Sequence, residues 1–126
     1  MSNNINKQVS ISLAEAEIAT GQDLHGTITI NYSARWDSIV INSQIENSND
    51  IFSYMTINGK NIRYPYARLS IFKTELGYKT NAIKFTAVTK HIPAAEYSNA
   101  KFRVSIIQEH KEVTSDTARL KIIKRD

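Results

Sequence analysis

The chain has 126 residues, a formal net charge of +4 and no cysteine, and 41% of its residues are hydrophobic and 22% charged. This length and composition suit one globular domain with a core of its own. The lack of cysteine excludes a disulfide scaffold, thiolate zinc sites and a cysteine nucleophile. No N-terminal apolar stretch and no window of about 18 uninterrupted apolar residues occurs. We therefore expect a soluble, cytoplasmic protein with no transmembrane segment.

The apolar residues favour β-structure, because 18 Ile stand against 5 Leu. Side chains branched at Cβ fit a pleated, half-buried surface and lose rotamer freedom in a helix. Residues 1–7 are mostly polar, and we expect them to form a flexible N-terminal arm. The domain itself is expected to span residues 8–124.

The first strands are predicted from period-two alternation. Residues 9–13 alternate apolar with serine, and the pattern continues through 14–18 as one extended strand. A turn around Gly21 leads into the clearest strand, residues 24–32. Within it, Gly26 predicts a bulge or the close approach of a neighbour.

The middle of the chain carries the strongest turn signals. Strands over residues 39–45 and 51–57 flank a polar turn at 47–50. Asn58-Gly59 then predicts a two-residue hairpin. Because proline cannot donate to a strand ladder, Pro65 places the return strand at a sheet edge.

The rest of the chain continues the alternation. Further strands are predicted around residues 67–71, 83–89, 102–106 and 118–122, with a loop at 75–79, a connection of roughly eight residues after Pro93 and a polar turn at 109–116. No amphipathic helix is evident. The sequence therefore predicts a single all-β domain, an antiparallel immunoglobulin-like or arrestin-like β-sandwich of about eight strands, with a barrel as the alternative.

Two stretches resemble arrestin-like domains such as the arrestin N-domain. One runs from Val9-Ser-Ile-Ser-Leu13 to Thr20-Gly21-Gln22-Asp23-Leu24-His25-Gly26-Thr27-Ile28-Thr29-Ile30. The other is the strand ending at Ile92-Pro93, followed by Phe102-Arg-Val-Ser-Ile106. The resemblance covers about half of the chain, and the chain has length for only one of the two sandwiches of a full arrestin. It implies an adaptor or scaffold role through protein contacts and no catalytic residue.

No enzyme chemistry is predicted. The chain has no nucleophile elbow, phosphate-binding glycine motif or H-E-x-x-H pair. His25 is expected on a polar strand face, whereas His91 and His110 could meet at one end of the sandwich. A weak metal site at Glu109-His110 with His91, and a calcium site at residues 47–50, are both less favoured than plain surface roles. We predict no catalytic residue, no metal and no cofactor.

Charge is unevenly distributed. Residues 60–90 hold seven basic residues and one acidic residue, interleaved with aromatic ones. Cations beside aromatic rings can hold single-stranded nucleic acid, and a basic surface can bind an anionic membrane. The favoured interpretation is that the rings belong to the core or a sheet edge, and that the cations protect that edge.

The Tyr64-Pro65-Tyr66 edge is the preferred binding site. An exposed edge strand can accept a strand of a partner, and tyrosine and arginine are frequent interface anchors. The predicted partner-binding residues are Tyr64, Tyr66, Arg63 and Arg68. The favoured function is a non-enzymatic interaction module that binds a protein through this edge or through end loops. The alternatives are binding of nucleic acid or anionic membrane, and self-assembly into a homo-oligomer.

Overall fold

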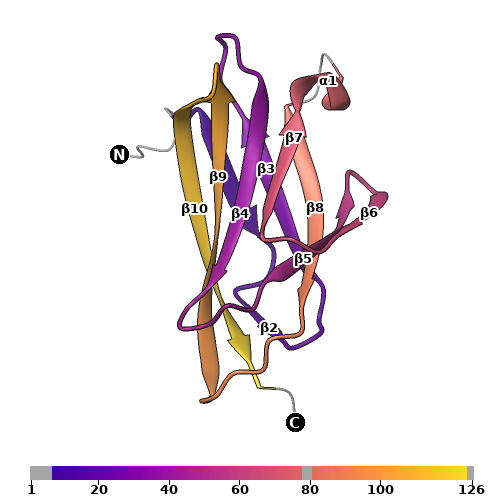
Figure 1. The fold of residues 1–126 in the computed structure, drawn as a ribbon, viewed down its shortest axis with the longest axis vertical. Coiled ribbons are helices and arrows are strands. Elements are labelled where there is room, and N and C mark those ends of the chain that lie inside the picture. The colour runs from indigo at the N-terminus through magenta and orange to yellow at the C-terminus, as the bar shows by residue number, and fades with distance from the viewer. Residues whose placement is uncertain (1–6, 78–80, 125–126) are drawn as a thin grey trace.

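A computed structural model describes residues 7–77 and 81–124, which form two five-stranded sheets packed as a sandwich (Figure 1). The first sheet has the order β1-β3-β8-β5-β6 and the second β2-β10-β9-β4-β7. The elements are β1 (Val9–Leu13), β2 (Glu17–Ala19), β3 (Leu24–Ile30), β4 (Ser38–Ile45), β5 (Phe52–Ile57), β6 (Lys60–Tyr64), β7 (Arg68–Phe72), α1 (Lys73–Leu76), β8 (Ala82–Thr89), β9 (Tyr97–Gln108) and β10 (Lys111–Ile123). The predicted all-β sandwich is confirmed, with ten strands.

The inward faces of the two sheets form one core. Alternate residues of β3 and β8 are buried, which is the period that predicted these strands, and β4 and β9 keep this period except for short runs of consecutive buried residues. Three aromatic rings meet at the centre: Phe102 lies 4.8 Å from Phe52 and 5.7 Å from Phe85, centroid to centroid. Large rings bury much apolar area, so this cluster joins the sheets firmly.

Gly26 leaves space for the ring of Phe85. It pairs with Phe85 across β3 and β8, and a Cβ at this position would lie 2.3 Å from Phe85 Cζ. Real carbon atoms do not approach so closely, so the ring of Phe85 covers the glycine. The predicted close approach is confirmed.

The predicted single strand through residues 14–18 is wrong. Ala14 still donates to the carbonyl of His25 (2.8 Å), but the chain then leaves the first sheet. β2 pairs in parallel with β10 in the second sheet. Ile11 and Ile18 are both buried. Alternation therefore continues on both sides of the break, and it carries no information on which sheet receives each part.

Two turn predictions had different outcomes. The Asn58-Gly59 hairpin is confirmed, with both residues at positive φ (49° and 81°), as a tight hairpin requires. The polar turn expected over 109–116 is present but shorter: it is confined to Glu109 and His110, both at positive φ, because β10 already begins at Lys111. The first residues of β10 carry mostly polar, exposed side chains, so the sequence pattern of this strand resembles that of a loop.

The loop expected at 75–79 is partly replaced by α1, a single helical turn, and residues 78–80 lie outside the described part. Within the described residues, no helix is long and apolar enough to span a membrane. Of the predicted N-terminal arm, residues 1–6 lie outside the described part. Lys7 is described, and its Nζ lies 2.9 Å from Asp116 Oδ1.

Candidate functional site

The four predicted binding residues lie along the crossing from β6 in the first sheet to β7 in the second. Arg63 and Tyr64 end β6, Tyr66 lies between the strands, and Arg68 begins β7. The crossing is fixed at Ala67, whose carbonyl accepts from the buried Tyr54 hydroxyl (2.8 Å) and from the Ser43 amide (3.2 Å). The structure therefore brings Tyr64 and Tyr66 together and places Arg63 and Arg68 in different sheets.

The two tyrosines are not equivalent. Their rings meet edge to face, with centroids 5.1 Å apart. Tyr64 is half-buried and packs against the core, whereas Tyr66 is 62% exposed. Tyr64 therefore supports the fold at this corner, and Tyr66 is the ring that a partner can reach.

The edge of β6 is poorly suited to receive a partner strand. Its pairing with β5 shifts register between Tyr54 and Thr56, and Arg63 has a positive φ of 47°. Pro65 follows its last residue and has no N–H to donate. Bulges, charges and proline are the features by which proteins blunt an edge strand.

The edge of β7, by contrast, is regular. β7 pairs with β4 over its whole length without a register shift, and it ends the second sheet. The bonds Lys73 N to Asp37 O (2.9 Å) and Ser43 N to Ala67 O (3.2 Å) fix which residues exchange hydrogen bonds with β4. By the alternation of an antiparallel ladder, Leu69 and Ile71 bond to β4.

The N–H and C=O groups of Arg68, Ser70 and Phe72 consequently point away from β4. Phe72 is the N-cap residue of α1, so its C=O accepts the first hydrogen bond of that helical turn. We call the other five groups the free edge of β7, and none of these five is bonded to another described residue. The sequence prediction included Arg68 but missed Ser70 and Phe72, because the partner strand of β7 could not be known from the sequence.

A pocket of about 420 Å³ lies at the end of the free edge. It is lined by Arg35, Trp36, Asp37, Phe72, Lys73, Thr74 and Gly77. Lys73 Nζ lies 4.9 Å from the Trp36 ring centroid, a cation–π contact, and Phe72 is 52% exposed. The only tryptophan of the sequence was the one available signal for this pocket.

The expected meeting of His91 and His110 does not occur. His91 precedes β9 and His110 follows it, so the full length of this strand separates them. No group of three or more potential metal ligands is found among the described residues. His25 lies on an exposed strand face, as predicted, with Nδ1 2.8 Å from a Glu15 carboxylate oxygen.

His91 is instead a buried hydrogen-bonding group. Its Nδ1 lies 2.7 Å from Asp50 Oδ2 and its Nε2 2.8 Å from Ser98 Oγ. The hydrogen bond between His91 Nδ1 and Asp50 is the main reason that the pKa of Asp50 is lowered.

The connectivity of Asp50, His91 and Ser98 matches that of an Asp-His-Ser catalytic triad. The exposure of these side chains differs from that of a triad. The Asp50 side chain is 60% exposed and that of His91 9%, whereas a catalytic triad buries the acid and exposes the serine to substrate. The arrangement therefore ties the loop after β4 to the ends of β8 and β9.

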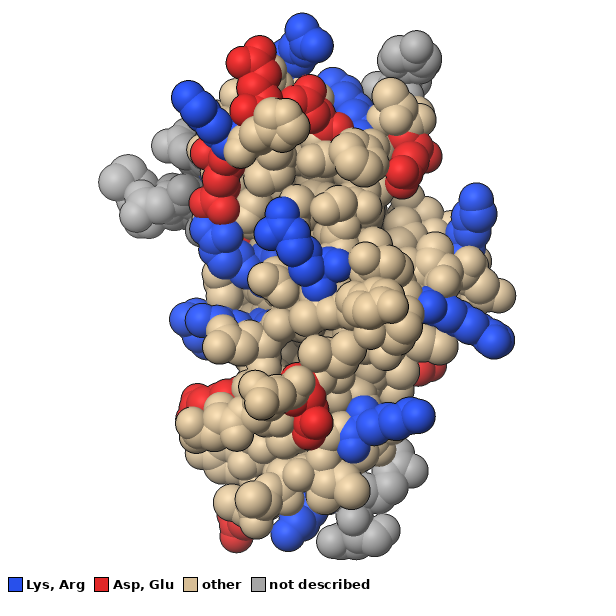
Figure 2. All heavy atoms as spheres, in the orientation of Figure 1, with Lys and Arg blue, Asp and Glu red and all other residues tan. Residues whose placement is uncertain are grey.

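The basic residues of segment 60–90 do not share one face. Lys60 and Arg63 lie on β6 and Lys84 on β8, all in the first sheet, whereas Arg68 lies on β7 in the second. Lys79 lies outside the described residues. Figure 2 shows Lys and Arg side chains spread over the whole face drawn, with acidic and uncharged residues between them. The described cations of this segment therefore form no continuous basic strip.

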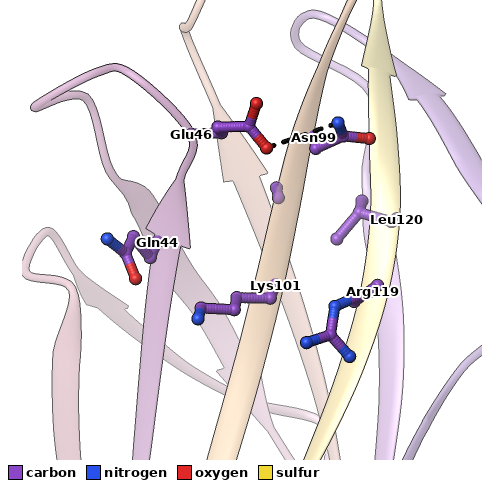
Figure 3. Close-up of a pocket in the computed structure, with 7 residues that line it drawn as sticks. Gln44, Glu46, Asn99, Lys101, Arg119 and Leu120 are labelled. Carbon is purple, nitrogen blue, oxygen red and sulfur yellow. Dashed lines mark hydrogen bonds between the residues drawn. The ribbon is translucent and has the colours of Figure 1, made fainter.

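A second pocket, of about 470 Å³, lies on the second sheet, away from the free edge. It is lined by Gln44, Glu46, Asn99, Ala100, Lys101, Arg119 and Leu120 (Figure 3). Its polar side chains come from Gln44 on β4, Glu46 just after β4, Asn99 and Lys101 on β9, and Arg119 on β10. The signal that could have revealed it is Lys101 and Arg103 on one strand and Arg119 and Lys121 on the next, each pair spaced by two.

No family model and no curated protein sequence matches the chain. Solved structures do match. An adhesin of enterotoxigenic E. coli is 14% identical with a TM-score of 0.60, over 94% of this chain and 49% of that one. The human F-spondin reeler domain is 12% identical with a TM-score of 0.55, over 92% and 89%. A conjugative transposon lipoprotein from Bacteroides eggerthii is 8% identical with a TM-score of 0.53, over 91% and 96%.

These similarities establish the fold alone, because identities are so low. The shared property is a β-sandwich, and none of the three matched proteins is an arrestin. The arrestin-like relationship therefore stays a prediction.

Proposed function

We propose that this domain is a non-enzymatic protein-interaction module, of the adaptor or scaffold kind, that binds an extended segment of a protein partner along β7. The observation that carries the proposal is the free edge: five backbone groups of Arg68, Ser70 and Phe72, on a strand of regular register, without a partner in the described chain. An added strand would bond to these groups and extend the second sheet. Main-chain bonds of this kind supply affinity with little dependence on sequence.

Selectivity would come from side chains around the free edge. Tyr66 and Phe72 are large and exposed, and they lie just before β7 and at its end. The pocket at Trp36 begins where Phe72 ends the strand, so it could take one apolar or aromatic side chain of the partner. We expect the preferred segment to be extended, with an apolar residue near one end.

Other predicted functions fit the structure less well. The dispersed cations of segment 60–90 give no support to nucleic-acid or membrane binding through that segment. Self-assembly would use the same free edge with a second copy as the partner. Sedimentation at several protein concentrations separates these cases, because only self-assembly gives a mass that rises with concentration. The end loops, where Ile51 and Ile92 are exposed, are a further surface for a protein partner.

The test is the pair of variants Ser70→Pro and Ser70→Ala. Peptides that bind the domain are first selected from a displayed library of random peptides and are then titrated against both variants. Proline removes the outward N–H of residue 70 without removing a bond to β4, whereas alanine keeps this N–H. We expect Ser70→Pro to weaken binding about tenfold or more and Ser70→Ala to leave it unchanged. Equal binding by the proline variant, with its circular dichroism spectrum retained, would contradict the proposal.

A further inference from the structure

One row of side chains crosses the outer face of the second sheet. Lys101 on β9 pairs directly with Arg119 on β10 and with Gln44 on β4. All three side chains are exposed, and Figure 3 shows them at one level of the sheet. Two like charges placed opposite each other across strands repel and destabilise a sheet. The pairing of Lys101 with Arg119 therefore needs a compensating partner.

Two other cations on this face, on the same two strands, already have partners. Arg103 forms a bidentate ion pair with Glu112, at 2.7 and 2.6 Å, and Lys121 Nζ lies 4.4 Å from the Tyr97 ring centroid. Lys101 and Arg119 form no ion pair with another described residue. These two cations thus remain available to an anion that arrives from solution.

The next row of the same pocket has a different chemistry. Glu46 and Asn99 lie beside the two cations, joined by a weak contact of 3.4 Å from Asn99 Nδ2 to Glu46 Oε2 (Figure 3). The amides of Asn99 and Gln44 can both donate and accept, and the Glu46 carboxylate can only accept. Such a set suits hydroxyl groups, which also donate and accept.

From this pattern we infer that the pocket formed by Gln44, Glu46, Asn99, Lys101 and Arg119 binds an acidic sugar. The carboxylate of the sugar would lie between Lys101 and Arg119, and its hydroxyl groups would bond to Gln44, Asn99 and Glu46. The volume of about 470 Å³ falls in the range of small-ligand sites. Single-stranded nucleic acid fits less well, because bases need aromatic platforms and Tyr97 on this face is already covered by Lys121. This site is separate from the free edge of β7, and it does not depend on the proposed function.

The test uses short oligomers of galacturonic acid as the probe, followed by NMR shifts of the labelled protein. The fully methyl-esterified oligomer is the control ligand, since it keeps the ring hydroxyls and loses the charge. We expect the acid form to shift the amide signals of residues 44–46, 99–101 and 119–120, and the ester to bind at least about tenfold more weakly. Binding of the ester as tight as that of the acid would overturn the inference, and so would no binding of the acid form.

Variants locate the site. Lys101→Gln combined with Arg119→Gln should reduce affinity for the acid oligomer about tenfold or more. Lys84→Gln removes an exposed lysine from the first sheet and should leave affinity unchanged. Gln44→Ala, which leaves both charges, should give a smaller loss. Unchanged affinity in the double variant, or tighter binding of a short single-stranded oligonucleotide than of the sugar acid, would refute the assignment.

Discussion

The edge strands β1 and β7 differ in whether an outward backbone amide has a hydrogen-bond partner. At β1, the amide of Ile11 donates to Asp116 Oδ2 at 2.9 Å, and Lys7 pairs with the other oxygen of the same carboxylate. At β7, no described side chain reaches the outward amides. The central outward amide of β1 is therefore bonded to a residue of the opposite sheet, whereas no outward amide of β7 is bonded to a described residue.

A single carboxylate thus occupies the middle of the β1 edge. Partial burial acts to raise the pKa of Asp116, but the hydrogen bond from the Ile11 amide and the charge of Lys7 outweigh it, so the pKa is lowered. The ionised form is thus favoured in the folded protein. A carboxylate beside Ser70 could accept from its outward amide in the same way. No described residue does so, and for this reason we assign the binding role to β7.

The largest expected effect comes from opening β1. Asp116→Ala leaves the Ile11 amide without its acceptor at a buried residue, and we expect a loss of about 2 kcal/mol in the free energy of unfolding. Urea denaturation measures this loss as a lower midpoint with an unchanged slope. Asp116→Asn, which keeps an acceptor oxygen, should lose less. Equal stability of the alanine variant and the wild type would mean that the carboxylate does not close this edge.

Acid should open β1 without a mutation. Because the pKa of Asp116 is lower in the folded than in the unfolded protein, the unfolded state binds more protons in the window below about pH 5. The stability due to this carboxylate is therefore fully present at neutral pH and is lost as pH falls through the folded pKa. We expect the wild type and Asp116→Asn to differ by about 1 kcal/mol at pH 7 and to converge as the pH falls. A difference that grows towards acid would have the wrong sign.

The smallest effect on stability should come from closing β7. Ser70→Lys adds a charge on an exposed edge position, and we expect a change within about 0.5 kcal/mol in the free energy of unfolding. Binding of the selected peptides should nevertheless weaken. Ser12→Lys is the matched control, because Ser12 is exposed on β1, the edge whose central outward amide is already bonded. If both lysine variants bind peptides like the wild type, β7 is not the acceptor strand.

The strands could be predicted because a buried face imposes a period of two, as in Leu24, Ile28 and Ile30 of β3. The hairpin at Asn58-Gly59 could be predicted because both positions need positive φ. The break after Ala14 could not, since residues on both sides of it are buried against the same core. The start of β10 was missed because its first residues are polar and lie outside the core.

The candidate site was predicted only in part, because an edge is a property of the sheet order. Pro65 correctly placed β6 at an edge, but the sequence did not show that β6 is bulged or that β7 is the regular edge. Lys101 and Arg119 are 18 positions apart, and only the register of β9 with β10 makes them neighbours.

The most direct test of the open edge is amide hydrogen exchange of β7, followed residue by residue by NMR. The amide of Ser70 points outward, whereas those of Leu69 and Ile71 bond to β4. We predict that the Ser70 amide exchanges on the order of 100-fold faster than its two neighbours, while the Ile11 amide is protected by Asp116. Equal protection of Ser70, Leu69 and Ile71 in the free protein would contradict the account.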